Sequence, residues 1–328
     1  MNNNKWAIFS DVDGTIYPFP DKTLSDVTKN KIRWLKTQNI PFVLNTGNPP
    51  LAKIQRLAEQ LNIQYLCCSN GAMIYDNLAK KPVHIEIMDT NEASKVFPLA
   101  LEAGVILYYM GTDQYYLYGN NEPYRKFLTE FNEYNDWIDD GTIPNDLHKI
   151  EAYGTEEQLK HFYQLVLDAN LNFEISNVLN KYIEITSVGI SKGSALKWMC
   201  QNVFNIDPKN VMAIGDSAND ISMFKQTDFS YVMDNSDPKT KSVAKFYTSD
   251  VRQNGIVEAI DDYLYRSDYD LYLKNLEQQQ IQRRKQTKAQ KDAKMQSFSG
   301  KLRKKIRNTS LKVKSFFRKL FRIKKARQ

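Results

Sequence analysis

Two aspartates stand one residue apart, at positions 11 and 13, directly after the apolar run Trp6–Phe9. In an extended segment residues i and i+2 point to the same side, so Asp11 and Asp13 place both carboxylates at the carboxyl end of a predicted strand. Open α/β sheets bind their ligands at that edge. Two close carboxylates repel each other unless a cation, a shared proton or acid–base chemistry occupies them. The pair therefore predicts a catalytic or metal-binding edge.

Two further motifs carry groups that can meet an anion. Thr46 and Gly47 follow the apolar run Pro41–Leu44 and offer a hydroxyl and backbone N–H groups to a phosphoryl oxygen. Lys192 precedes the helix predicted over 194–202. A cation at this positive end of a helix dipole is unfavourable unless an anion sits beside it. Lys192 therefore indicates an anionic ligand or a neighbouring carboxylate.

The last motif adds more oxygen ligands. Asp216, Asn219 and Asp220 follow the apolar run 211–214. Together with Asp11 and Asp13 they provide hard oxygen donors or the supports of such donors, which suits Mg²⁺. We therefore expect Mg²⁺ as the cofactor.

In this order, these motifs resemble those of the haloacid dehalogenase (HAD) superfamily of phosphatases, in its Cof-type branch (subclass IIB) with a large inserted cap. The resemblance covers residues 5–262 and extends to Ser69-Asn70-Gly71-Ala72, Asn235 and Asn254-Gly255. It implies that the protein is a phosphoric monoester hydrolase. The tail beyond residue 262 lies outside the resemblance.

The resemblance also implies a role for each catalytic side chain. Asp11 would attack the phosphorus and form an aspartyl-phosphate. Asp13 would protonate the leaving oxygen and then act as base for the hydrolytic water. Thr46, Gly47 and Lys192 would hold the phosphate oxygens.

The same resemblance assigns the metal site. Mg²⁺ would be held by Asp11, Asp216 and the backbone carbonyl of Asp13, and Asn219 and Asp220 would orient it from behind these ligands.

One residue departs from the branch's pattern. The branch commonly has Thr-Gly-Arg at the second motif, and this chain has Asn48 in place of the arginine. The change removes a bidentate contact with phosphate, and we expect it to affect which substrate the protein binds.

Composition and patterning predict the architecture. With 328 residues and 42% hydrophobic side chains the chain can bury a sizeable core. Short apolar runs alternate with helical patterns over 24–38 and 51–61, which favours a doubly wound, Rossmann-like parallel-sheet α/β core. An aromatic-rich central stretch indicates an inserted α+β cap domain. We expect a first core part over 1–81, a cap over 82–186, a second core part over 187–264 and a tail over 265–328.

The tail differs sharply from the rest of the chain. From residue 271 on, twenty basic residues stand against only Glu277 and Asp292, a net charge of +18, whereas residues 1–270 carry −11. We predict a basic, Gln-, Lys- and Arg-rich helical tail. On a helical wheel one face collects the apolar residues Val313, Phe316, Phe317, Leu320, Phe321 and Ile323.

The tail suggests a partner, and the whole chain suggests a compartment. A basic helix with bulky apolar residues on one face fits an anionic membrane surface, here through residues 297–328. RNA binding by a basic arm is the main alternative. The sequence has no signal-peptide core, no transmembrane run and no disulfide pattern among its three cysteines. We expect a cytoplasmic protein, with peripheral attachment to the inner membrane surface as the further hypothesis.

Two functions remain open at this point. The first is a Mg²⁺-dependent phosphatase of a small phosphorylated metabolite, either a sugar phosphate or a nucleotide-like cofactor. The second is a catalytically weak phosphatase-fold scaffold or targeting protein that acts through its tail on membrane or RNA.

Overall fold

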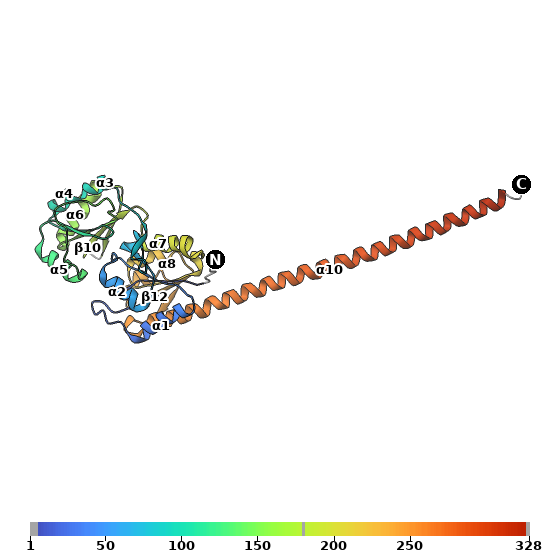
Figure 1. Ribbon diagram of the computed structural model, residues 1–328, viewed down its shortest axis with the longest axis horizontal. Helices are drawn as coiled ribbons and strands as arrows, with labels where there is room; N and C mark the ends of the chain where they lie inside the picture. The colour runs from blue at the N-terminus through green and yellow to red at the C-terminus, as the bar shows by residue number, and fades with distance from the viewer. Residues whose placement is uncertain (1–5, 179–180, 326–328) are drawn as a thin grey trace. The chain divides into compact units, whose positions relative to one another are not determined.

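The computed structural model describes residues 6–178 and 181–325 and is shown in Figure 1. The chain divides into two compact units, Met1–Leu264 and Tyr265–Gln328. Within the described residues, none of the helices combines the length and the apolar composition that crossing a membrane demands.

The first unit is built on an eight-stranded sheet. In spatial order its strands are β13 (Phe246–Thr248), β12 (Phe229–Met233), β11 (Met212–Gly215), β1 (Ile8–Ser10), β2 (Phe42–Asn45), β3 (Tyr65–Cys68), β4 (Met73–Asp76) and β5 (Lys81–Ile85). Neighbouring strands from β13 to β3 run parallel, which confirms the predicted Rossmann-like core.

The far edge of this sheet differs from the prediction. Strands β3, β4 and β5 are antiparallel neighbours. Because β5 pairs with β4, the core sheet continues to Ile85, four residues beyond the boundary that we predicted at residue 81. The alternating segment that starts at Pro82 is therefore the edge of the core sheet rather than the start of the cap.

Helices cover both faces of the core sheet (Figure 1). Successive residues of a strand point to opposite faces. Accordingly Ile8 packs in one cluster with α1 (Asp26–Thr37) and α2 (Ala52–Leu61), whereas Phe9 packs in another with α7 (Lys192–Met199) and α8 (Ile221–Phe224). Burial on both faces explains why these strands read as unbroken apolar runs. A short helix, α9 (Pro238–Lys241), precedes the edge strand β13.

The inserted cap has its own antiparallel sheet. Its strands, in spatial order, are β7 (Tyr115–Tyr118), β6 (Ile106–Met110), β8 (Lys149–Tyr153), β10 (Tyr182–Ser187) and β9 (Phe173–Val178). Its helices are α3 (Thr90–Ser94), α4 (Val96–Ala103), α5 (Glu122–Asn132) and α6 (Glu156–Asp168). Helices α4 and α6 pack on one face of this sheet and form a separate apolar core with it.

A long helix, α10 (Gly255–Lys325), ends the described chain and begins within the first unit. Ile256, Ala259, Ile260 and Tyr263 are buried there, and this spacing of three and four residues places them on one face. The Tyr263 hydroxyl donates to the Asn210 carbonyl at 2.7 Å.

The second unit confirms the predicted helical tail. From residue 274 on, every side chain that the structure describes is exposed. Val313 is among them, whereas the side chains of the remaining predicted apolar face, Phe316, Phe317, Leu320, Phe321 and Ile323, lie outside the described residues. The membrane-facing surface of the tail therefore stays a prediction.

Two isoleucines of α10 test where the core ends. Ile260 is fully buried and Ile281 is 45% exposed on the same helix. We expect Ile260→Ala to lower the free energy of unfolding by about 2–5 kcal/mol, because it leaves a cavity. Ile281→Ala should change it by less than about 0.5 kcal/mol. Urea unfolding of both full-length variants measures the difference, and equal losses would contradict this account of the core.

Candidate active site

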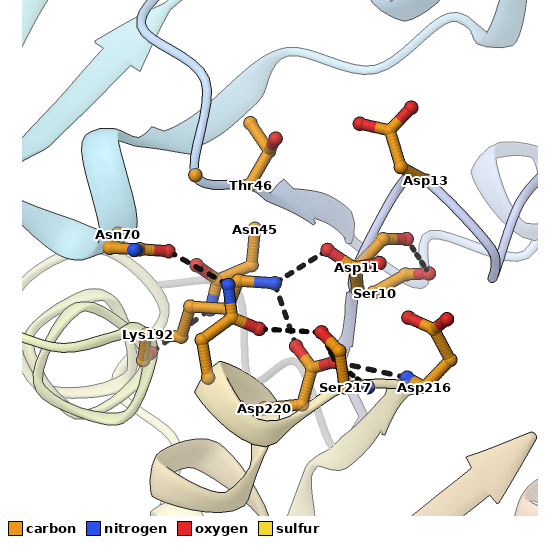
Figure 2. Close-up of polar contacts among 12 residues, drawn as sticks. Ser10, Asp11, Asp13, Asn45, Thr46, Asn70, Lys192, Asp216, Ser217 and Asp220 are labelled. Atoms are coloured by element: carbon orange, nitrogen blue, oxygen red, sulfur yellow. Dashed lines mark hydrogen bonds and ion pairs between the residues drawn. The ribbon is translucent and has the colours of Figure 1, made fainter. Parts of the chain in front are cut away.

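The candidate site lies where three neighbouring parallel strands end. Asp11 follows β1, Thr46 follows β2 and Asp216 follows β11, and β1 pairs with both of the other strands. The carboxyl ends of parallel strands meet at one edge, so these side chains converge although they lie up to about 200 positions apart in the chain. Figure 2 shows them around one space.

Lys192 lies at the centre of the charges (Figure 2). It is the first residue of α7, and its fully buried ammonium donates to Asp11 Oδ1 at 2.5 Å and to Asp220 Oδ1 at 2.7 Å. Burial alone would lower the pKa of Lys192, but the two carboxylates outweigh it and raise the pKa. A carboxylate neighbour therefore accounts for the cation at this helix end.

Asp220 holds the loop that carries Asp216. Its second oxygen, Oδ2, accepts from the backbone N–H groups of Asp216 and Ser217, both at 3.0 Å. Gly215 allows the close approach, since a Cβ there would lie 2.2 Å from Asp220 Cγ. Both oxygens of Asp220 are thus engaged, one by Lys192 and one by the loop.

Gly14 and Asn235 fix Asp216 from the other side. Gly14 has φ +84°, and a Cβ there would lie 2.3 Å from Asp216 Oδ2. The Asn235 amide donates to the Gly14 carbonyl at 2.9 Å and to Asp216 Oδ2 at 3.3 Å. Asn235 gave only a weak signal in the sequence, because an Asn after Asp234 is equally typical of a turn.

The carboxylates fit a divalent cation. Asp11, Asp216 and Asp220 offer oxygens within 4.8 Å of one another. Burial, which Lys192 offsets only in part, raises the pKa of Asp11 to about 7, and burial together with Asp11 raises the pKa of Asp216 to about 9. Asp216 Oδ1 is buried without a hydrogen-bond partner among the described residues. A hard cation would satisfy this oxygen and stabilise the charged carboxylates.

Asn48 connects Asp13 with Thr46. Its side-chain amide lies 3.4 Å from Asp13 Oδ2 and donates to Thr46 Oγ1 at 3.2 Å, and its backbone N–H donates to the same hydroxyl at 3.1 Å. The residue that departs from the branch's pattern therefore contacts both a predicted acid and a predicted phosphate ligand.

A cavity of about 680 Å³ joins this edge to the cap. Asp11, Asp13, Thr46, Gly47 and Asp216 line its floor. Aromatic side chains of the cap also line it, namely Tyr108, Tyr124, Phe127, Phe131, Tyr153 and Tyr182. The volume suits a small molecule with apolar ring faces.

The sequence analysis missed three charged residues on the cap strands. Lys149, Glu151 and Glu184 are all buried, and Lys149 Nζ lies 2.6 Å from Glu151 and 2.7 Å from Glu184. The sequence does show charged residues alternating with apolar residues along β8 and β10. The pairing between the two strands was not visible, because it depends on their register.

Asn219 lies beside the cluster of Asp11, Asp216 and Asp220 rather than in it. Its amide donates to Asn70 Oδ1 at 3.2 Å, and its own Oδ1 accepts from the Ser217 hydroxyl at 2.9 Å. Asn70 in turn donates to Glu184 at 2.6 Å. Asn219 therefore links the loop of Asp216 to the cap.

Comparison with known proteins identifies relatives over this same region. A sequence model of the haloacid dehalogenase-like hydrolases matches residues 8–260. The chain is 26% identical over 255 residues to 5-amino-6-(5-phospho-D-ribitylamino)uracil phosphatase YcsE of Bacillus subtilis, covering 76% of this chain and 92% of that relative.

Solved structures share the fold. A haloacid dehalogenase-like hydrolase from Bacteroides thetaiotaomicron superposes with a TM-score of 0.69 at 22% identity, over 78% of this chain and 98% of that one. The HAD subclass IIB sugar phosphatase BT4131 gives 0.68 at 19% identity, with the same coverage of both chains.

The buried ammonium predicts a large stability effect. Lys192→Met leaves Asp11 and Asp220 without their shared partner, so we expect a loss of about 3–5 kcal/mol in the free energy of unfolding. Lys197→Met, at an exposed position on the same helix, is the matched control and should have almost no effect. Urea unfolding in metal-free buffer compares the two. Similar midpoints would show that Lys192 does not balance these carboxylates.

Proposed function

This chain belongs to the haloacid dehalogenase-like hydrolase family and is a phosphatase of that family, and we propose that it hydrolyses a small phosphorylated metabolite through an aspartyl-phosphate with Mg²⁺ as cofactor. The observation that carries the proposal is the shared ammonium of Lys192, which holds Asp11 at the floor of the cavity beside Asp216. A scaffold without catalytic activity would not require Asp11, Lys192 and Asp216 to be held together in this way.

Asp11 and Asp216 would hold the metal ion, with Asp220 and Asn235 fixing the loop and the Asp216 side chain. When bound, Mg²⁺ offsets the repulsion between these carboxylates and the phosphate of the substrate. The support for this assignment is the donor set and the unpartnered oxygen of Asp216.

Asp11 is the proposed nucleophile. Its Oδ1 is held by Lys192, so its second oxygen can attack the phosphorus as the bond to the leaving oxygen breaks. Asp13 donates a proton to that leaving oxygen. It then takes a proton from water, whose oxygen attacks the phosphorus and releases the Asp11 carboxylate and inorganic phosphate.

Thr46, Gly47 and Lys192 are the proposed phosphate ligands. Thr46 and Gly47 line the cavity next to Asp13, and Lys192 supplies the positive charge below it. Hydrogen-bond donors held in place in this way stabilise charge that develops on the phosphoryl oxygens in the transition state.

The cavity favours a sugar phosphate or a nucleotide-like cofactor as substrate. Rings from Phe127, Tyr153 and Tyr182 provide flat apolar faces for a substrate of either class. The name of YcsE refers to a phosphorylated ribitylaminouracil and that of BT4131 to sugar phosphates, which agrees with both classes. Because the cap covers the site, large protein substrates are disfavoured.

The tail supports a second proposal, attachment of this phosphatase to the anionic inner surface of a membrane. The specific observation is a net charge of +18 from residue 271 on, carried by a helix whose described side chains are exposed. RNA offers the same kind of charge and is the alternative partner.

The nucleophile can be tested on a panel of phosphate esters with and without Mg²⁺. We expect the wild type to need the ion and Asp11→Asn to lose at least about 10³-fold in turnover, since the amide cannot form the acyl phosphate. Asp113→Asn, an exposed position on the cap, is the matched control and should keep full activity. An equal trace rate in the wild type and Asp11→Asn would favour the scaffold hypothesis.

The tail is tested by co-sedimentation with vesicles that contain anionic lipid. Full-length protein should sediment, and a chain ending at Leu264 should stay in solution with unchanged turnover of soluble esters. Each basic residue near such a surface contributes about 1 kcal/mol, so salt should weaken binding. Changing Phe316 and Phe317 to Ser should weaken it further. Complete release by salt, together with insensitivity to these changes, would point to RNA.

A further inference from the structure

Lys149 is a buried cation of the cap that the phosphoryl-transfer steps above do not use. It is the first residue of β8 and is fully buried. Its ammonium lies 2.6 Å from Glu151 Oε1 and 2.7 Å from Glu184 Oε1, and it donates to the Gly47 carbonyl at 3.1 Å. Two of these partners belong to the cap, and the third belongs to the phosphate-binding segment of the core.

Strand register explains the two cap contacts. Glu151 of β8 pairs directly with Glu184 of β10, which places two carboxylates side by side on one face of the sheet. Like charges opposite each other destabilise a sheet. Lys149 lies two residues before Glu151 and so on the same face. Burial alone would lower the pKa of Lys149, but Glu151 and Glu184 outweigh it and raise the pKa.

The third contact sets the direction of a core peptide. The peptide bond between Gly47 and Asn48 is planar and trans, so its carbonyl and its N–H point in opposite directions. Lys149 holds the carbonyl on the cap side. The Asn48 N–H is therefore turned toward Thr46, where it donates to the hydroxyl at 3.1 Å. A flip of this peptide would remove the N–H that holds the Thr46 hydroxyl at the place proposed for the phosphate.

A second chain of contacts runs from the same cluster to the loop of Asp216. Glu184 Oε2 accepts from the Asn70 amide at 2.6 Å, and Asn70 Oδ1 accepts from the Asn219 amide at 3.2 Å. Asn219 belongs to the loop of Asp216. Lys149, Glu151 and Glu184, which we call the cap triad, thus contact the segment of Gly47 directly and the loop of Asp216 through Asn70.

We propose that Lys149 is a positioning residue, which fixes the Gly47–Asn48 peptide from the cap so that the Asn48 N–H holds the Thr46 hydroxyl beside the phosphoryl group. This inference rests on the proposed function of the site. It makes the geometry of the phosphate-binding segment depend on a docked cap, although Lys149 itself does not line the cavity.

A pair of variants tests the contact with Gly47. Lys149→Met alone would leave two buried carboxylates side by side and risks unfolding. The double variant Lys149→Met/Glu184→Gln keeps the net charge of the cap triad at −1. The single variant Glu184→Gln retains the ammonium on Gly47 and is the matched control. Arg56→Met breaks an ion pair with Glu133 between α2 and the end of α5, and so controls for weaker docking of the cap.

Steady-state hydrolysis of several phosphate esters is the first measurement. Relative to Glu184→Gln, the double variant should lose about 10- to 100-fold in kcat, with KM within about threefold, since the misplaced donor acts in the transition state. The loss should be the same for every ester, because the phosphoryl group is common to all of them. A loss that follows the leaving group, or one that Arg56→Met reproduces, would overturn the proposal.

Amide hydrogen exchange is the second measurement and needs no turnover. Pro49 and Pro50 have no N–H, so Gly47 and Asn48 carry the only backbone amide hydrogens of residues 47–50. Exchange in this segment should be at least about tenfold faster in the double variant than in Glu184→Gln, because a held peptide opens rarely. Unchanged exchange overturns the proposal whatever the kinetics. Faster exchange in a protein that hydrolyses no ester would instead reject the proposed function and keep the role of Lys149.

Discussion

The ammonium of Lys192, shared between Asp11 and Asp220, is the interaction on which the rest of the site depends. Parallel-strand topology forces several aspartates to one buried edge, and burial makes their repulsion strong. The Lys192 ammonium offsets part of that repulsion. Through the same two ion pairs it connects helix α7 to the loops after β1 and β11. We propose that a hard cation binds beside Asp216, whose Oδ1 is buried without a hydrogen-bond partner among the described residues. Stability and chemistry therefore draw on the same charges.

The cap repeats this solution with different elements. Glu151 and Glu184 meet because their strands pair in that register, and Lys149 lies between them. Each buried lysine has two carboxylate partners, and each also connects segments that strand pairing does not hold together. Lys192 anchors a helix start, and Lys149 reaches a turn across the boundary between cap and core. An ammonium suits this role because its three donors can serve partners from separate segments.

The sequence predicts those features of the fold and the site that depend on residues close together in the chain. The parallel core was predictable because each buried strand is a continuous apolar run with polar residues directly after it, as at Phe9 and Asp11. The antiparallel edge formed by β4 and β5 was not, since Pro82–Ile85 alternates in the same way as the cap strands. Lys149 and Glu184 were missed because only tertiary pairing brings them together. Asn48 was noticed as a departure, but its contacts with Asp13 and Thr46 required the folded loop.

The placement of the cap within the chain has a consequence for synthesis. Strand β1 lies between β2 and β11, and the whole cap separates β2 from β11 in sequence. On a ribosome the cap, whose strands are continuous in the chain, can complete its sheet while the core still lacks the neighbour of β1. Asp11 lacks its cation until residue 192 has emerged, and it lacks its full complement of acidic neighbours until residue 220 has emerged. The nascent core therefore exposes one flank of its central strand for the time taken to make more than a hundred residues, and this flank is where a chaperone or a misfolded pairing would meet the chain first.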